Sequence, residues 1–261
     1  MSVKITIVTV SLNSEKYIST AIESVLLQDY TNIEYIIVDG GSTDGTLEII
    51  KSYGERISNV ISEPDDGLYD AMNKGISAST GEIIGFLNSD DFYLDKFVVS
   101  KVAQLYREDP NLSVALGNVD FALPNDIDTS VRVFSSFNFS PWKLRFGLMP
   151  PHPSSFVRRS AYNVVGQYSS DYIIAADFEW FCRAFLVCNL RYEKINQILV
   201  RMRMGGVSTS GLRSYYTSSL EMLRALKDNN IYSNLLFVLF RLPVKFISKY
   251  KNQKGHSLGA L

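Results

Sequence analysis

Two hydrophobic periodicities alternate over the first hundred residues. Short apolar, β-branched runs have the length of strands, and amphipathic stretches with a helical period separate them. The runs predict strands over residues 4–10, 33–39, 57–63 and 82–87. The stretches predict helices over residues 14–28, 42–53, 67–79 and 95–108, the last with Phe97, Val98, Val102, Leu105 and Tyr106 facing inward. This alternation predicts an α/β fold with a Rossmann-like, mostly parallel sheet flanked by helices.

The pattern loosens after about residue 109. It predicts strands over 113–123, 130–137 and 191–204, a strand and short helix within 154–168, and a helix over 176–190. We expect this half to complete the same domain, which would then comprise residues 1–210 with halves at 1–108 and 109–210. Residues 211–261 are expected to form a C-terminal helical extension.

Small and acidic polar residues follow each of the first four predicted strands. In a parallel sheet the carboxyl ends of the strands meet at one edge, and ligands bind there. One polar turn is common, but four at the same edge predict a site. The residues are Ser11 and Asn13, then Asp39, then Asp65 and Asp66, and finally Asn88, Ser89, Asp90 and Asp91.

The segment "DGGSTDGT" begins at Asp39, and its three glycines with Ser, Thr and Asp suit a tight turn before a helix. A structural turn explains it without any ligand. It is not a dinucleotide fingerprint, because that pattern follows the first strand, so an NAD site is disfavoured. Asp39 stands at the strand end, where its carboxylate could accept hydrogen bonds from a nucleobase.

The segment "NSDD", residues 88–91, places two carboxylates side by side. Either water solvates them in a surface turn, or a cation neutralises them. Mg²⁺ is commonly held by one or two carboxylates together with substrate phosphates. A bound cation would also remove the like-charge repulsion that raises the pKa of one carboxylate.

Two acidic residues interrupt the apolar segment "AADFEWFCRAF". Asp177 and Glu179 could cap the start of a helix, or a carboxylate beside Phe178 and Trp180 could serve as a general base. His152, between prolines, is either a loop residue or a donor to a phosphate or an acceptor hydroxyl.

Arg201 and Arg203 lie in the last predicted strand, within "LVRMRM". They are either solvated strand residues or the counter-charges of a diphosphate.

Composition narrows the class of protein. The net charge of −1 and pI of about 6.2 give no basic footprint, so we expect no nucleic-acid partner. Cys182 and Cys188 alone cannot build a disulfide scaffold or a four-ligand zinc site, which fits a reducing compartment. The N-terminal run predicts a strand rather than a signal peptide, and no apolar run reaches the ~18 residues of a transmembrane helix.

The last segment has a different charge pattern. No acidic residue follows Asp228, while lysines and arginines stand beside the apolar run "LLFVLF". This composition suits a segment that lies on anionic lipid. A terminal helix packed on the domain, with solvated lysines, is the other interpretation.

Six segments together resemble the family 2 glycosyltransferases of the GT-A fold. They are "TIVTVSLNSEKYISTAIESVLLQDY", "IEYIIVDGGSTDGT", "SEPDDGLYDAMNKGI", "STGEIIGFLNSDD", "PHPSSFVRRSAY" and "AADFEWFCR". The resemblance covers residues 3–208 and is nearest to bacterial enzymes that build O-antigen, capsule or exopolysaccharide units. It identifies residues 1–108 as the nucleotide-sugar half and 109–210 as the acceptor half.

The resemblance implies an activity and its partners. These are inverting transfer from a UDP-sugar, with a hexose favoured, to a hydroxyl of a saccharide acceptor, with Mn²⁺ or Mg²⁺ as cofactor. The acceptor would be carried on a polyprenyl diphosphate. The enzyme would be cytoplasmic and peripheral, on the anionic inner face of the plasma membrane.

The resemblance also assigns roles to single residues. Asp177 matches the catalytic base, Asp90 the metal-binding aspartate, and Asp39 the aspartate that binds the base of the nucleotide. The other positions expected to line the nucleotide and donor pocket are Thr9, Ser11, Asn13, Asp65, Asp66, Asn73, Lys74, Asn88 and Ser89. Possible contacts to the diphosphate or acceptor are Asp91, His152, Glu179, Arg201 and Arg203.

Three positions depart from the family pattern. Asn88 replaces the first aspartate of the DxD motif, Ala176 replaces the acid before the base, and Met204 stands where many members have histidine. These departures support one alternative, a degenerate transferase fold kept as a non-catalytic subunit. A sugar nucleotidyltransferase is a second alternative, but "TVSLNSEKY" lacks the basic glycine-rich loop that would hold a triphosphate.

Overall fold

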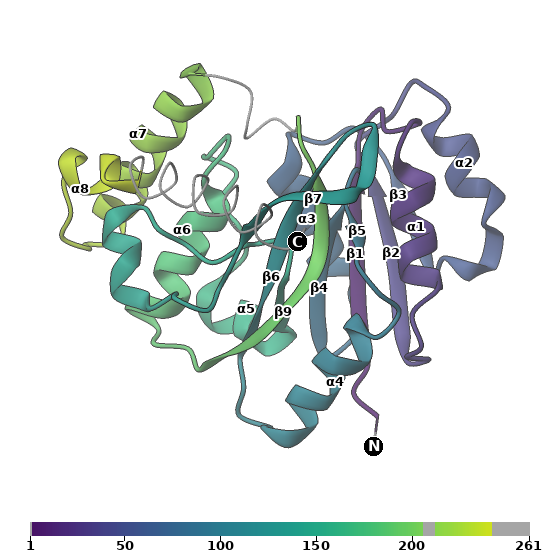
Figure 1. Ribbon diagram of the computed structural model, residues 1–261, viewed down its shortest axis with the longest axis horizontal. Coiled ribbons are helices and arrows are strands. Elements are labelled where there is room, and N and C mark those ends of the chain that lie inside the picture. The colour runs from purple at the N-terminus through teal and green to yellow at the C-terminus, as the bar shows by residue number, and fades with distance from the viewer. Residues whose placement is uncertain (1, 206–211, 242–261) are drawn as a thin grey trace, which may run out of the picture.

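The computed structural model describes residues 2–205 and 212–241, with the side chains of residues 212 and 213 left out (Figure 1). Residues 206–211, shortly after Met204, and most of the lysine-rich tail lie outside the described residues. The strands are β1 Ile5–Ser11, β2 Ile33–Asp39, β3 Asn59–Ser62, β4 Ile83–Asn88, β5 Phe92–Tyr93, β6 Val114–Leu123, β7 Asp126–Phe134, β8 Ser155–Arg158 and β9 Tyr192–Arg203.

Helices connect many of these strands, and two more helices follow the last strand within the described residues. The α-helices are α1 Ile18–Leu26, α2 Thr46–Ser52, α3 Leu68–Ala78, α4 Val98–Glu108, α5 Arg159–Val165, α6 Ala176–Cys182, α7 Leu212–Asp228 and α8 Leu235–Leu239. Short helical turns are η1 Gly54–Arg56, η2 Pro141–Phe146 and the π-helical η3 Arg183–Val187. None of the described helices combines the length and the apolar character needed to cross a bilayer.

The described strands form one nine-stranded sheet in the order β3-β2-β1-β4-β8-β6-β9-β5, with β7 paired to β6. The four strands β3, β2, β1 and β4 are parallel, as the alternation of strand and helix predicts. β8 then runs antiparallel between β4 and β6, while β6 and β9 are parallel. The mostly parallel sheet is therefore confirmed, with its antiparallel pairs in the second half.

Side chains alternate between two cores, one on each face of the sheet. Ile5 and Ile7 of β1 pack with α1, α2 and α4, whereas Val8 and Val10 pack with α3, α5, α6 and α7. The alternation follows from the period of two along a strand, and the near-continuous apolar runs are those of a sheet covered on both faces. Figure 1 shows helices on both sides of the sheet.

Some expected elements differ in detail. Phe97 is not inward: it is 45% exposed, because α4 begins at Val98 and Phe97 precedes its first turn. The predicted helix over 176–190 divides into α6 and the π-helical η3. The two-residue strand β5 was not predicted, since it exists only through its pairing with β9.

The C-terminal extension is helical over its described part, as predicted. Met222, Ala225 and Leu226 of α7 and Val238 of α8 join the core that contains Phe178 of α6. Arg241 is buried beneath α7, where its guanidinium donates to the hydroxyls of Ser218 and Ser219 at 2.8 Å each. These helices therefore pack on the domain.

Candidate active site

The sheet register brings the four polar strand ends together. Ser11 of β1 lies beside Asp39 of β2, Asp39 lies beside Ser62 of β3, and Val10 lies beside Asn88 of β4. The loops after these strands therefore leave from one edge. The structure thus gathers the segments singled out in the sequence at the edge where parallel sheets bind ligands.

Asp39 organises the loop that follows β2. It is fully buried, and its carboxylate accepts hydrogen bonds from the hydroxyls of Ser11 (3.2 Å) and Ser62 (3.1 Å) and from the amides of Gly41 (3.1 Å) and Ser42 (2.9 Å). These donors hold the carboxylate of Asp39 in one position. Its direct effect in this structure is to shape the "DGGS" turn.

Polar contacts connect the loops after β1, β2 and β4. Asn13 has a φ of 49°, and its side-chain oxygen accepts from the amide of Thr43 at 2.9 Å. The hydroxyls of Ser14 and Ser89 lie 2.7 Å apart. Thr9, in contrast, lies within β1, and its hydroxyl is bonded to that of Tyr35 at 3.0 Å inside the core.

Hydrogen bonds and ion pairs among its own residues and those of α3 hold the segment between β3 and α3 in place. Asp65 accepts from the amide of Gly67 at 3.0 Å, and the amide of Asp66 donates to Asp70 at 3.2 Å. Lys74 pairs with Glu63 at 3.0 Å and with Asp70 at 3.2 Å. These contacts hold the loop against the start of α3.

Asn73 of α3 reaches the second half of the chain. Its amide group donates to the carbonyl of Tyr168 at 2.8 Å, and its side-chain oxygen accepts from the amide of Tyr168 at 3.0 Å. The hydroxyl of Tyr168 lies 2.8 Å from Nε2 of His152. Burial lowers the pKa of His152 to about 4, so this histidine is a neutral core residue near pH 7.

The first acidic pair, Asp90 and Asp91, lies just after β4 in a mostly dry setting. Burial raises the pKa of Asp90, and it raises that of Asp91 well above its usual range, with the charge of Asp90 adding to the effect. Asp91 accepts hydrogen bonds from Nδ2 of Asn88 at 3.0 Å and from the amide of Arg203 at 3.3 Å. Asn88 thus supports Asp91 in this structure.

Arg203 is the cation nearest to this pair. Its guanidinium donates to the carbonyl of Asp90 at 2.7 Å and lies over the rings of Tyr17 (4.7 Å) and Phe92 (5.2 Å). Its Nε is buried and has no hydrogen-bond partner among the described residues. The positive charge of Arg203 lowers the pKa of Asp90, in opposition to burial.

The second acidic pair, Asp177 and Glu179, lies in the first turn of α6. Glu179 is buried, and both its oxygens accept from Arg183 at 2.7 Å, so its charge is neutralised. Asp177 accepts from the amide of Phe178 at 2.7 Å and from the hydroxyl of Tyr69 at 3.3 Å. Burial raises the pKa of Asp177 to about 6, so it is ionised at neutral pH but close to its protonated form.

Glu221 of α7 braces the segment that leads into α6. Its carboxylate accepts from the amides of Ile173, Ile174 and Ala175, each at 2.9 Å. The carbonyl of Ile174 also accepts from the hydroxyl of Tyr69 at 2.6 Å. The sequence analysis missed Glu221 and Tyr69, because no local motif marks either of them and only the tertiary structure places them beside Asp177.

Arg201 lies among carboxylates of the protein itself. Its guanidinium donates to both oxygens of Asp120 at 2.7–3.1 Å and to the carbonyl of Ile127 at 2.8 Å. In this structure it ties β9 to β6 and to β7. Arg203 is therefore the member of the arginine pair that faces the acidic pair after β4.

Comparisons with known proteins agree with this geometry. Residues 6–165 match the family model described as glycosyl transferase family 2. The chain is a family 2 glycosyltransferase. It is 33% identical over 186 residues to an uncharacterized glycosyltransferase of Mycobacterium tuberculosis, covering 70% of each chain. It is 27% identical to a PGL/p-HBAD biosynthesis glycosyltransferase of Mycobacterium bovis, over 92% of this chain and 90% of the relative.

Solved structures share the fold. A fragment of S. aureus TarS in complex with UDP-GlcNAc has a TM-score of 0.67 at 20% identity, covering 85% of this glycosyltransferase and 66% of the fragment. The chain spans only 39% of the longer TarS chain. The mannosyltransferase PcManGT of Pyrobaculum calidifontis, with GDP-Man and Mn²⁺, has a TM-score of 0.65 at 14% identity. The GT-A fold is therefore confirmed, and the family gives no support to a sugar nucleotidyltransferase.

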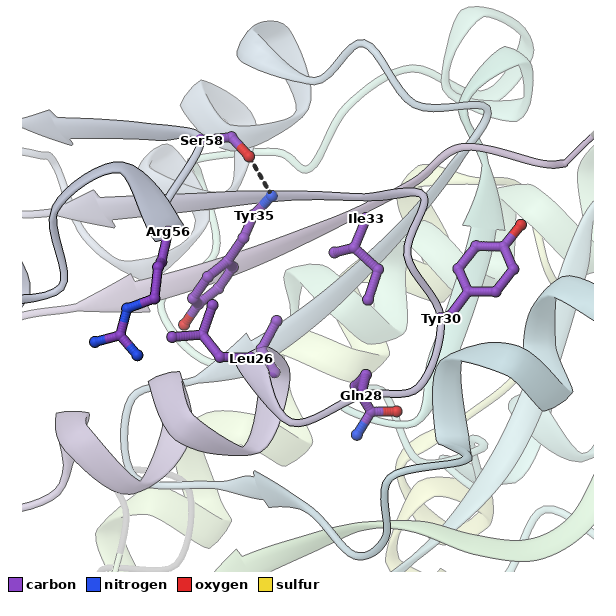
Figure 2. Close-up of a pocket in the computed structure, with 8 residues that line it drawn as sticks. Leu26, Gln28, Tyr30, Ile33, Tyr35, Arg56 and Ser58 are labelled. Carbon is purple, nitrogen blue, oxygen red and sulfur yellow. Dashed lines mark hydrogen bonds between the residues drawn. The ribbon is translucent and has the colours of Figure 1, made fainter.

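A small cavity lies away from these residues. It has a volume of about 130 Å³ and is lined by Leu26, Tyr30, Ile33, Tyr35 and other side chains between the end of α1 and the start of β2 (Figure 2). Ile33 is the first residue of β2, so the cavity faces the amino ends of the parallel strands. It is thus at the opposite edge from Asp39 and belongs to the scaffold rather than to the candidate active site.

Proposed function

We propose that this glycosyltransferase inverts the anomeric centre while moving a hexose from a UDP-sugar to a hydroxyl of a saccharide acceptor. The observation that supports this most directly is Asp177, a carboxylate with a pKa of about 6 and no paired cation among the described residues, beside a neutralised Glu179. A hydroxyl is a weak nucleophile, and a general base that takes its proton is most effective when its pKa is close to the working pH. Inversion then needs one displacement and no protein nucleophile.

Asp177 is the proposed base. Its Oδ1 is held by the amide of Phe178 and the hydroxyl of Tyr69, which leaves Oδ2 as the oxygen that would take the acceptor proton. Glu179 is not proposed for this role, because Arg183 already occupies both of its oxygens. Ala176, which replaces the acid preceding the base in relatives, removes one further negative charge from this dry turn.

The carboxylates after β4 suit a divalent cation that arrives with the nucleotide. Asp90 is the proposed ligand, with Asp91 as its neighbour held by Asn88. The described residues include no cluster of three or more metal-binding side chains. That donor set fits Mg²⁺ or Mn²⁺, which are commonly bound by one or two carboxylates plus substrate phosphates. When bound, the ion would offset negative charge on the leaving nucleoside diphosphate.

The nucleotide is proposed to lie across the ends of β1, β2 and β3. Asp39 would act on it chiefly through the turn that it shapes, together with Ser11, Asn13 and the segment from Asp65 to Lys74. Arg203 is the proposed counter-charge of the diphosphate, since its guanidinium lies beside Asp90 and its Nε lacks a protein partner among the described residues. The TarS complex with UDP-GlcNAc makes UDP-sugars the first donors to test.

The acceptor is proposed to be a saccharide on a polyprenyl diphosphate, used at the cytoplasmic face of the plasma membrane in surface polysaccharide synthesis. The sequence resemblance to O-antigen, capsule and exopolysaccharide enzymes supports this assignment. A second candidate function is a non-catalytic subunit, which the replacements Asn88, Ala176 and Met204 favour.

A donor screen with a synthetic lipid-diphosphate sugar tests the proposal. We expect transfer from one UDP-hexose in the presence of Mn²⁺ or Mg²⁺, with NMR of the product showing the opposite anomer to the donor. Retention of the donor anomer would contradict the role given to Asp177. Thermal stabilisation by UDP and Mn²⁺ together, beyond that given by either alone, would argue against a subunit that has lost its site.

A further inference from the structure

An aromatic seam joins two segments that lie about ninety residues apart in the chain. In η2, the rings of Trp142 and Phe146 are 5.8 Å apart, and Phe146 stacks on Phe237 of α8 at 4.7 Å. The ring of Phe240, just after α8, lies 6.1 Å from that of Phe146. The hydroxyl of Ser233 donates to the carbonyl of Arg145 at 2.6 Å, which fixes the two segments together.

The outer side of this seam is strongly exposed. Trp142 is 56% exposed, Leu236 79% and Phe240 55%, although each is a large apolar side chain. Single exposed apolar residues are ordinary, but a contiguous group of them marks an interaction surface. We call Trp142, Leu236 and Phe240, with the basic residues described next, the η2–α8 surface.

The charges around the η2–α8 surface are of one sign. The sequence contains no acidic residue from 129 to 170, the stretch that includes η2, and none from 229 to 261, the stretch that includes α8. Lys143 and Arg145 lie in η2, and Lys227 lies at the end of α7. A chain with a net charge of −1 therefore brings its two longest acid-free stretches into contact at this place.

Glu221 and Asp228, the acidic residues of α7, are both hydrogen-bonded, although the side chain of Asp228 is 49% exposed. Glu221 binds the amides of residues 173–175, and Asp228 accepts from the hydroxyl of Tyr172 at 3.0 Å and from Arg224 at 3.2 Å. They do not offset the basic side chains of η2. The positive character of the surface therefore persists where the apolar side chains are exposed.

An apolar hollow opens between α7 and α8 beside this surface. It measures about 360 Å³, and its lining includes Leu223, Leu226, Ile231 and Leu235, with Lys227 also lining it. A hollow of this kind has room for part of a hydrocarbon chain, with a cation available for a phosphate group. Like the exposed seam next to it, the hollow combines apolar side chains with a neighbouring cation.

We propose that the η2–α8 surface docks on an anionic lipid bilayer. Trp and Phe side chains enter the headgroup region of a membrane, and basic residues beside them are attracted to anionic lipids. The proposal extends the proposed function, on whose lipid-linked acceptor it rests, because α7 connects this surface to the segment that holds Asp177. It differs from membrane binding by the lysine-rich tail alone, since half of the surface comes from η2.

Vesicle sedimentation of the full chain tests the proposal. The vesicles contain phosphatidylcholine with about one third phosphatidylglycerol, and pure phosphatidylcholine vesicles are the comparison. We expect binding to the anionic vesicles that weakens in about 1 M salt, where charge attraction is screened over ~3 Å. Trp142→Ala/Phe240→Ala and Arg145→Glu/Lys227→Glu should each lower the partition coefficient about tenfold.

Matched controls use exposed residues at distant places in the fold. Leu27→Ala/Phe97→Ala removes two exposed apolar side chains, and Lys51→Glu/Lys96→Glu reverses two exposed charges. Both controls should bind vesicles as the unmodified protein does. The unfolding temperature of every variant is measured, so that a loss of binding is not confused with a loss of folding.

Three results would overturn the proposal. The first is no binding to anionic vesicles, and the second is binding that the seam and charge variants leave unchanged, which would assign it to residues 242–261. The third is a dimer in sedimentation velocity that Trp142→Ala/Phe240→Ala dissociates, because the surface would then be an interface between copies. Transfer to the synthetic lipid-diphosphate sugar in detergent, without vesicles, is assayed in parallel: its absence with vesicle binding intact would count against the proposed function alone.

Discussion

The acidic pair after β4 and the acidic pair in α6 have different electrostatic environments. Asp90 and Asp91 stand after β4, and both have raised pKa values because they are buried together. Asp177 and Glu179 stand in α6, but Arg183 neutralises Glu179 and leaves Asp177 as the one carboxylate with a raised pKa. The first pair is therefore suited to binding a cation, and Asp177 of the second pair is suited to accepting a proton.

The difference shows how a protein assigns roles to like residues. Two uncompensated carboxylates at one place gain stability from a divalent ion, whereas a single dry carboxylate gains basicity. The partner of each pair decides the role: Asn88 supports Asp91 without adding charge, and Arg183 removes Glu179 from the chemistry. Four substitutions would break or sharpen this contrast, and they are given in order of expected effect.

Replacement of the proposed base should have the largest effect. Asp177→Asn should lower kcat by about 10²- to 10⁴-fold, the usual contribution of a general base, while the Kd for UDP stays within about twofold. Asp171→Asn, at an exposed position shortly before α6, is the matched control and should keep full activity. Robust transfer by Asp177→Asn would remove this residue from its role.

The same substitution predicts a gain in stability. A carboxyl group whose pKa is raised from 3.8 to about 6 on folding stabilises the folded state only while it is protonated, so stability is lost as the pH rises through 6. At pH 7.5 the ionised Asp177 therefore costs about 3 kcal/mol. Asp177→Asn should unfold at the same temperature as the unmodified protein, or higher, in a thermal melt at that pH.

Replacement of the proposed metal ligand should have the next effect. Asp90→Asn should weaken Mn²⁺-dependent UDP binding about 100-fold in calorimetry, because the only carboxylate proposed to bind the ion loses its charge. Asp91→Asn retains an acceptor oxygen for Asn88 and should cost about tenfold, as supporting residues of metal sites do. Equal effects of the two would mean that both are ligands.

Breaking the ion pair between Arg183 and Glu179 should affect the stability of the fold instead of catalysis. Arg183→Met leaves the buried Glu179 without its cation and should lower the free energy of unfolding by about 2 kcal/mol, somewhat less than for a fully buried pair. Arg191→Met removes an arginine that is 59% exposed from its ion pair with Asp109, and it should cost less than about 1 kcal/mol. If Glu179 were the base, Arg183→Met would instead change the pH dependence of kcat.

Replacement of Glu221 should have the smallest effect on activity, and it should also change the pH dependence of activity. Glu221→Gln removes a charge that binds three amides before α6, and kcat/KM should fall about tenfold. The negative charge of Glu221 also raises the pKa of Asp177, so the acidic limb of the activity profile, expected near pH 6, should move to lower pH. Asp228→Asn, the other acid of α7, should leave this limb in place.

The sequence by itself determined most of the first half. The alternation of β-branched runs and amphipathic stretches predicted β1 to β4 with their helices, and the residues after each strand predicted that the candidate site lies at one edge of the sheet. These features are local: a period of two or of 3.6 and a polar residue at a strand end depend on near neighbours in the chain. The parallel register then follows from the fold class.

Only the tertiary structure decided which of the candidate residues are already bound to other groups of the protein. Arg201 and Glu179 are bound by Asp120 and Arg183, Asp39 is surrounded by donors, and Asp177 is left with a raised pKa. Charge compensation and burial depend on side chains that come together from distant parts of the chain, as Glu221 and Asp177 do. For this reason no single stretch of sequence could show which carboxylate is free to act.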